Sequence, residues 1–125
     1  MNLLLDTHVL IWALEDNPIL SAEAHDAIVD GKNMVFVSSV SAWEISIKKA
    51  MGKLKAPDNL EEEIELHRFT PLNVNFEHAR LAGALPDIHK DPFDRMLIAQ
   101  AITEKLTLIS RDSQCADYGV SLLEA

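Results

Sequence analysis

The chain has 125 residues, with 20 acidic and 11 basic side chains that leave a formal net charge of −9. Hydrophobic residues make up 48% and charged residues 25%, which is typical of a globular protein with one core and argues against intrinsic disorder. The acidity argues against a protein that coats nucleic acid through a basic surface, but not against a nuclease, because metal ions can lie between acidic side chains and phosphate.

Short apolar runs alternate with helical patterns along the whole chain. The run at residues 2–6 predicts a buried strand, and a helix at 7–14 follows at once and ends before Asn17 and Pro18. Ser21 is placed to cap the next helix. The remaining predicted elements, in chain order, are that helix at 21–30, a strand at 34–38, helices at 41–51 and 58–67, a strand at 69–72, helices at 75–85 and 92–104, and strands at 106–110 and 120–123.

This alternation predicts an α/β fold with a central, mainly parallel sheet of about five strands, covered by helices on both faces. No linker or internal repeat divides the chain, so residues 1–125 are expected to form a single domain. The four glycines form neither of the glycine-rich loops that cradle phosphates, which disfavours nucleotide binding of the Rossmann or P-loop type.

Signals for export or membrane insertion are missing from the sequence. Its one cysteine, Cys115, allows no internal disulfide and is expected to be a buried, inert thiol. The first residues lack the basic segment of a signal peptide, and no apolar stretch approaches the roughly 20 residues that cross a bilayer. We therefore expect a cytoplasmic protein.

Four carboxylates are placed to meet at one edge of the sheet. Ligands of open α/β sheets bind at the carboxyl ends of the strands. Asp6 ends the first predicted strand, and Asp112 lies two residues beyond the fourth. Glu44 and Asp94 fall in the first turns of the helices predicted at 41–51 and 92–104. Each alone could cap a helix or complement its dipole, but together they would repel one another, and an all-oxygen cluster favours Mg²⁺ or Mn²⁺ over zinc.

The same four places carry recognisable sequence blocks, LLLDTHVLIW, SSVSAWEISIKKAMGKL, HKDPFDRMLIAQA and LISRD. In order and spacing these blocks resemble the signature blocks of PIN-domain nucleases, and more narrowly those of VapC-like toxins of type II toxin–antitoxin modules. The resemblance extends over residues 2–123. It implies a three-layer α/β/α sandwich, an endoribonuclease that hydrolyses RNA with one or two Mg²⁺ or Mn²⁺ ions, a cognate antitoxin as partner, and a homodimer.

The resemblance also implies roles for individual residues. The acidic set of the family falls on Asp6, Glu44, Asp94 and Asp112, with Asp6 and Asp94 the best candidates for direct metal ligands. The positions that support the metal site or the substrate fall on Thr7, Ser110 and Asp91, and Asp91 is also placed to cap a helix. Such a site would activate water for attack on phosphorus and leave a 5′-phosphate and a 3′-hydroxyl.

Basic side chains and histidines flank the acidic residues. Lys48, Lys49 and Lys53 follow Glu44 closely and either contact the RNA backbone or form a solvated helix face. The arginines next to two of the acids either position the phosphate or pair with a carboxylate, and the nearby histidines are interpreted as hydrogen-bonding residues at the rim rather than zinc ligands. These residues are Arg95, Arg111, His8 and His89.

Two other functions compete with a ribonuclease. A phosphatase like the haloacid dehalogenases also uses an Asp at a strand end and Mg²⁺, but it needs a second Asp two residues later, where this chain has His8. A binding module that keeps the PIN fold without catalysis is the other alternative. A covalent aspartyl phosphate on Asp6 would favour the phosphatase, whereas tight partner binding without metal affinity would favour the module.

Overall fold

The computed structural model describes residues 1–125 and contains one five-stranded sheet in the order β3-β2-β1-β4-β5. Every neighbouring pair of strands is parallel. The outer strand β3 tolerates Pro71, as an edge strand does. The strands are β1 (Asn2–Leu5), β2 (Met34–Ser38), β3 (Thr70–Leu72), β4 (Thr107–Ser110) and β5 (Leu122–Glu124).

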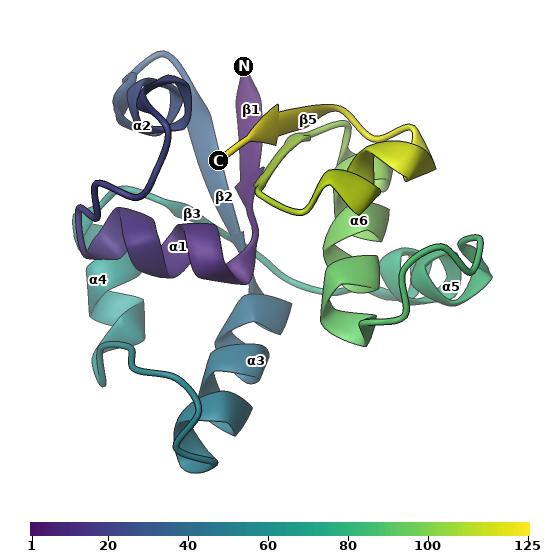
Figure 1. Ribbon diagram of the computed structural model, residues 1–125, viewed down its shortest axis with the longest axis horizontal. Coiled ribbons are helices and arrows are strands. Elements are labelled where there is room, and N and C mark those ends of the chain that lie inside the picture. The colour runs from purple at the N-terminus through teal and green to yellow at the C-terminus, as the bar shows by residue number, and fades with distance from the viewer.

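Helices cover both faces of this sheet. Figure 1 shows α1, α2 and α4 on one side of the strands and α5 and α6 on the other, while α3 continues from the end of β2. The helices are α1 (Thr7–Leu14), α2 (Ala22–Val29), α3 (Ser39–Ala50), α4 (Leu60–Leu66), α5 (Phe76–Ala84) and α6 (Pro92–Glu104). The expected three-layer α/β/α sandwich is therefore confirmed. No helix is long and apolar enough to cross a membrane.

The central strand β1 supplies both halves of the core because its side chains alternate between the faces. Leu3 and Leu5 pack with the cluster under α1 and α2, whereas Leu4 packs with the cluster under α6. All three are fully buried, and burying a leucine stabilises a fold by roughly 2 kcal/mol. The apolar runs of the sequence thus fix this strand between two helical layers.

The strand register aligns the residues that leave the sheet. Leu5 lies opposite both Val37 of β2 and Ile109 of β4. The next residue of each strand, Asp6, Ser38 and Ser110, is therefore at the same edge. Helices α1 and α3 begin directly after β1 and β2, where the side chains of Asp6 and Ser38 accept hydrogen bonds from the first turns. This edge is the carboxyl end of the parallel sheet.

Most predicted boundaries differ from the structure by one or two residues, and the differences that matter for the site lie in α3 and in the last part of the chain. Helix α3 begins at Ser39 rather than at residue 41, because the Ser38 hydroxyl accepts a hydrogen bond from the N–H of Val40. Glu44 consequently lies in the second turn of α3, not in the first. A 3₁₀ helix, η1 (Ser113–Tyr118), was not predicted; it ends at Gly119, which has a φ of 74°, and β5 starts two residues later than predicted.

Candidate metal centre

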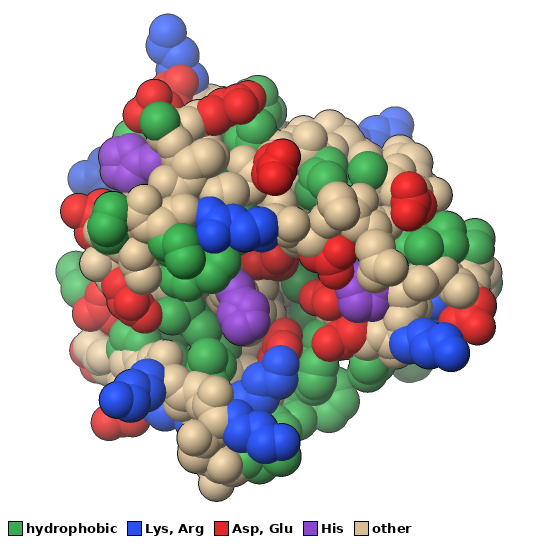
Figure 2. Space-filling model, in the orientation of Figure 1, with side chains coloured by type: hydrophobic (Ala, Val, Ile, Leu, Met, Phe, Trp, Pro, Cys, Tyr) green, Lys and Arg blue, Asp and Glu red, His purple; other side chains and the backbone are tan.

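Four elements bring acidic side chains to the carboxyl edge of the sheet. Asp6 caps α1, Glu44 lies on α3, Asp94 lies in the first turn of α6, and Asp112 caps η1 after β4. In Figure 2, acidic side chains lie beside and below a histidine to the right of the middle of this face, and Lys or Arg side chains lie further down and to the left, over α3. The topology thus gathers residues that are up to about a hundred positions apart in the chain.

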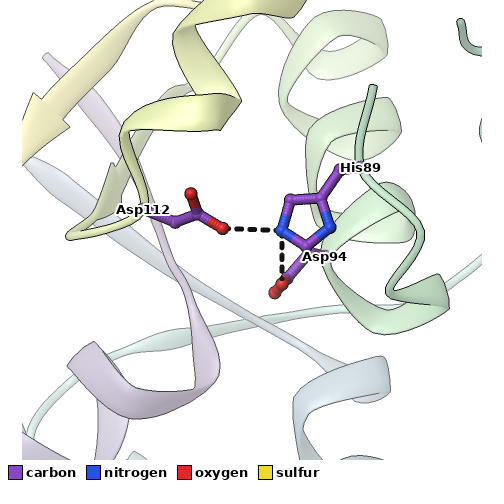
Figure 3. Close-up of side chains that lie close together, drawn as sticks. All are labelled: His89, Asp94 and Asp112. Carbon is purple, nitrogen blue, oxygen red and sulfur yellow. Dashed lines mark hydrogen bonds and ion pairs between the residues drawn. The ribbon is translucent and has the colours of Figure 1, made fainter. Parts of the chain in front are cut away.

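A histidine joins two of these acids (Figure 3). His89 Nε2 lies 2.6 Å from Asp112 Oδ2 and 3.1 Å from Asp94 Oδ2. One ligand atom from each of the three residues lies within 4.8 Å of the other two. The expectation that His89 forms hydrogen bonds near the acids is confirmed. Its ring lies between two of the acids rather than beside only one of them.

Burial and crowding disfavour the charged form of two carboxyls. Burial, helped by the charges of Asp91, Asp6 and Glu44, raises the pKa of Asp94 to about 7. Burial also raises the pKa of Asp6, and Glu44 adds to that rise, while hydrogen bonds from Ser110 and Val9 oppose it. These effects reach across the cluster, so Asp6, Glu44 and Asp94 share one electrostatic environment.

Glu44 is buried but well supplied with partners. Only 5% of it is exposed, and Thr7 Oγ1 donates a hydrogen bond of 2.6 Å to its Oε1. The ammonium group of Lys48, one turn further along α3, forms an ion pair with Oε2. The hydrogen bond between Lys48 and Glu44 raises the pKa of Lys48, and the charges of Asp91 and Asp94 add to this rise. Lys48 therefore acts as a counter-ion within the acidic cluster.

A small polar residue, Ser110, and the first aspartate of the DPFD block, Asp91, hold the backbone of the site. The buried Ser110 hydroxyl accepts a hydrogen bond of 3.1 Å from the N–H of Asp112. Asp91 Oδ1 accepts from the N–H groups of Phe93 and Asp94, which confirms that it caps α6. Both residues thus fix the directions in which Asp112 and Asp94 leave their elements.

Neither flanking arginine pairs with a carboxylate, which corrects the sequence interpretation. The Arg95 guanidinium donates to the backbone carbonyls of Ala82 and Leu85 at 2.8 Å, and also to those of Pro86 and His89. Successive side chains on a helix point about 100° apart, so Arg95 faces away from the acid beside it.

Arg111 departs from the interpretation in the same way. Its guanidinium lies over the Trp12 ring, 4.8 Å from the centroid, and donates hydrogen bonds to the backbone oxygens of Ile19 and Ala125. Arg111 therefore ties the end of α1 and the segment after it to the last residue of the chain, and makes no contact with the acidic cluster.

The lysines that follow Glu44 differ in the number of contacts that their side chains make. Lys49 Nζ binds Asp58 Oδ1 at 2.6 Å and the carbonyl of Ala56 at 3.0 Å, so it holds the connection between α3 and α4. Lys53 is exposed, without a hydrogen bond or ion pair from its side chain.

Cys115 is buried as expected, and burial raises the pKa of its thiol to about 11, which keeps the thiol protonated.

One hollow of the molecule lies away from these acids. It has a volume of about 680 Å³ between α1, α2 and the start of β2, and Leu20, Val35 and Phe69 line it. None of the four predicted acids reaches it. Large apolar hollows are common ligand sites, but here the titratable groups with perturbed pKa values gather elsewhere, and perturbed groups are the stronger indication of chemistry.

Two supporting residues escaped the sequence analysis. The Tyr118 hydroxyl accepts a hydrogen bond of 2.6 Å from the N–H of His89 and donates one to the carbonyl of Pro86. Tyr118 belongs to the unpredicted helix η1, so no pattern connected it with the acids. Ser41, fully buried, lies with its hydroxyl 3.1 Å from that of Thr7 and donates to it, because the Thr7 proton goes to Glu44. His8 is exposed and stacks on Trp12, with ring centroids 5.9 Å apart.

This arrangement agrees with a comparison between the chain and known protein families. The model of the PIN domain matches residues 3–120. The chain belongs to the PIN domain family. A comparison with curated proteins gives no match.

Solved structures with the same fold come from several bacteria. VapBC2 from Rickettsia felis, bound to a fragment of promoter DNA, has a chain that matches with a TM-score of 0.73 and 16% identity, covering 99% of this chain and 98% of that one. DNA-bound VapBC from Salmonella typhimurium gives 0.71 and 16%, with the same coverage. A toxin–antitoxin complex from Klebsiella pneumoniae gives 0.66 and 20%, covering 96% of this chain and 94% of that one. At these identities the likeness shows the fold.

The donor set of this PIN domain suits a hard divalent cation. Carboxylate oxygens are the ligands that Mg²⁺ and Mn²⁺ prefer. Burial, and after it the charges of neighbouring carboxylates, raise the pKa of Asp94, and a bound cation would relieve the repulsion between those charges. Asp94 Oδ1 accepts no hydrogen bond within the protein, whereas Asp112 Oδ1 accepts one, from the N–H of Gln114. The residues therefore fit a metal centre at this edge of the sheet.

Proposed function

We propose that residues 1–125 work as one PIN domain with metal-dependent endoribonuclease activity, and that the protein is the toxin of a type II toxin–antitoxin module. The observation that carries the proposal is the convergence of Asp6, Glu44, Asp94 and Asp112 at the carboxyl edge of the sheet, where the pKa of Asp94 is raised to about 7. Carboxyls so crowded favour bound cations, and phosphodiester hydrolysis is the chemistry that such cations assist.

Each residue of the centre has a role in this proposal. Asp6 and Asp94 would bind Mg²⁺ or Mn²⁺ directly, with Glu44 and Asp112 completing the site directly or through water. Thr7 holds Glu44 through a hydrogen bond of 2.6 Å, and Ser110 holds the backbone of Asp112. When bound, one or two such ions would neutralise charge on the phosphoryl oxygens and lower the pKa of a water molecule. Lys53, exposed and without a partner, remains available to contact the RNA backbone.

The activity is tested by cleavage of labelled RNA with Mg²⁺ or Mn²⁺. The double variant Asp6→Asn/Asp94→Asn should lose cleavage while its circular dichroism spectrum stays that of the parent. The double variant Asp16→Asn/Asp26→Asn is the matched control, because it changes the charge equally at two exposed positions outside the centre. Equal cleavage by parent and the first double variant would contradict the proposal. Metal-free binding of a partner would then favour a non-catalytic module, and an aspartyl phosphate on Asp6 a phosphatase.

The toxin role is supported by the fold neighbours, whose structures are of VapBC and toxin–antitoxin complexes. The antitoxin we propose would have a DNA-binding domain and a basic tail that is attracted to the acidic centre. Expression of the chain should stop growth, and co-expression of a small neighbouring open reading frame should restore it. Growth arrest by the Asp6→Asn/Asp94→Asn variant would show that the arrest does not come from this centre.

A homodimer is the assembly we propose, because the chain exposes large apolar side chains near the end of β2. Trp43 on α3 is 61% exposed and Phe76 on α5 is 84% exposed. The hydroxyl of Ser39, one turn before Trp43, accepts a hydrogen bond from the N–H of Val74, which brings the two regions together. Light scattering should give the mass of a dimer for the parent and of a monomer for Trp43→Ser/Phe76→Ser. A monomeric parent would contradict this.

A further inference from the structure

The loop that carries His89 is fixed by side chains from two other elements. Residues 85–91 form no helix or strand, yet the Arg95 guanidinium binds four backbone carbonyls around and within this loop. On the other side, the Tyr118 hydroxyl accepts from the N–H of His89 and donates to the carbonyl of Pro86. Some of these contacts satisfy carbonyls at the end of α5, and those to the carbonyl and N–H of His89 hold the backbone of that residue in place.

The ring of His89 is also held in one orientation, and its hydrogen bonds select one tautomer. Its Nδ1 accepts a hydrogen bond of 3.2 Å from the N–H of Asp91, which assigns the proton of the neutral ring to Nε2. Nε2 then donates toward Asp94 Oδ2 and Asp112 Oδ2, and the side chain is 13% exposed. A histidine that binds a metal usually donates a hydrogen bond through its other ring nitrogen. Here that nitrogen faces a donor, so the ring is arranged as a donor to carboxylates and not as a ligand.

We propose that His89 is a positioning residue, whose Nε2–H joins Asp94 to Asp112 and sets the two carboxylates for a divalent cation without itself binding the ion. The inference rests on the proposed function and goes beyond it in assigning this role. A carboxylate oxygen has two lone pairs, so a single N–H leaves the oxygens of both acids able to bind a cation.

The two acids need such a link because nothing else connects them. Asp94 begins α6 and Asp112 follows β4, and the two side chains form no other hydrogen bond to a side chain. Their charges repel, and neighbouring Asp6 and Glu44 push in the same direction. Residues that orient metal ligands typically contribute 10–100-fold to metal affinity, and we expect an effect of that size from His89.

The experiment measures binding of Mn²⁺ to the full chain by calorimetry. His89→Ala should weaken Mn²⁺ binding by about 10–100-fold, and His89→Gln should recover a large part of the loss, because the glutamine amide supplies an N–H in a similar place. His25→Gln is the control: it removes an exposed histidine that lies 3.6 Å from Asp16 and 3.5 Å from Asp26, away from the centre. Circular dichroism checks that each variant is folded.

The Co²⁺-loaded protein shows whether His89 binds the metal ion or only positions its ligands. The visible absorption of bound Co²⁺ should be the same in the parent and in His89→Gln, because His89 is not a ligand. A shifted spectrum would make His89 a ligand and overturn the proposal, as would unchanged or tighter Mn²⁺ binding by His89→Ala. If Mn²⁺ binds the parent and not Asp6→Asn/Asp94→Asn, those results leave the proposed metal site intact. If the parent binds no Mn²⁺, both proposals fail together.

Discussion

Two histidines of this PIN domain have the same local arrangement and different surroundings. A backbone N–H donates to Nδ1 of His78, from Asn75, and to Nδ1 of His89, from Asp91. In both, Nε2–H then faces carboxylate, at 2.9 Å from Glu104 in the first case. His78 lies fully buried between α5 and α6 with one acid, whereas His89 serves two acids within a group of five.

The difference separates a structural histidine from one in a functional centre. One donor matched to one acceptor satisfies the His78 ring and the Glu104 carboxylate and leaves no crowded negative charge for a cation. One donor shared by two carboxylates leaves negative charge unsatisfied, and burial, together with the charges of Asp91, Asp6 and Glu44, raises the pKa of one of the two, Asp94. The local geometry of a histidine therefore says less about its role than the number of acids around it.

The strongest test of this difference between His78 and His89 is to neutralise one acid beside each histidine. Asp94→Asn removes a proposed ligand from the crowded group and should weaken Mn²⁺ binding by at least about 100-fold. Glu104→Gln changes the charge equally beside His78 and should leave Mn²⁺ binding unchanged. Calorimetry on both variants decides the matter, and equal losses would mean that the acids act only through the overall charge of the chain.

The reverse effect is expected from the buried histidine. His78→Ala removes the side chain that completes the cap of α5 and binds Glu104, so it should lower the free energy of unfolding by about 2–4 kcal/mol. Its Mn²⁺ affinity should stay that of the parent. Urea unfolding measures the loss, and a variant as stable as the parent would show that water replaces these contacts at no cost.

The pH dependence of stability should also divide the two regions. The carboxyl of Asp94 has a pKa of about 7 in the fold against 3.8 as the ordinary value, so the native chain holds a proton that the unfolded chain releases above about pH 4. The stability from this group is full below that pH and is lost as the pH rises through 7. Without metal, the melting temperature of the parent should fall from pH 5 to pH 8 by more than that of Asp94→Asn. Parallel profiles for the two proteins would contradict the assignment.

Much of this fold follows from local sequence signals, whereas the centre depends on contacts that no local pattern encodes. Helices α1 and α6 have the predicted bounds because Asp6 and Asp91 cap them and Pro92 starts the second. The acids were found because each follows or opens a predicted element. The loop of His89, by contrast, is shaped by Arg95 and Tyr118 from separate elements, and such long-range hydrogen bonds leave no periodic trace in the sequence.

The smallest expected effect concerns two adjacent lysines on α3. Lys48 forms an ion pair with Glu44 and feels the charges of Asp91 and Asp94, so its ammonium repels a second cation entering the centre. Lys48→Met should therefore tighten Mn²⁺ binding by about 2–5-fold, which corresponds to about 0.5–1 kcal/mol. Lys49→Met removes an equal charge one residue away but breaks only the contacts that hold the α3–α4 connection, so it should leave Mn²⁺ affinity unchanged. Tighter binding in both variants would mean that net charge, rather than the position of Lys48 among the acids, sets the affinity of the centre.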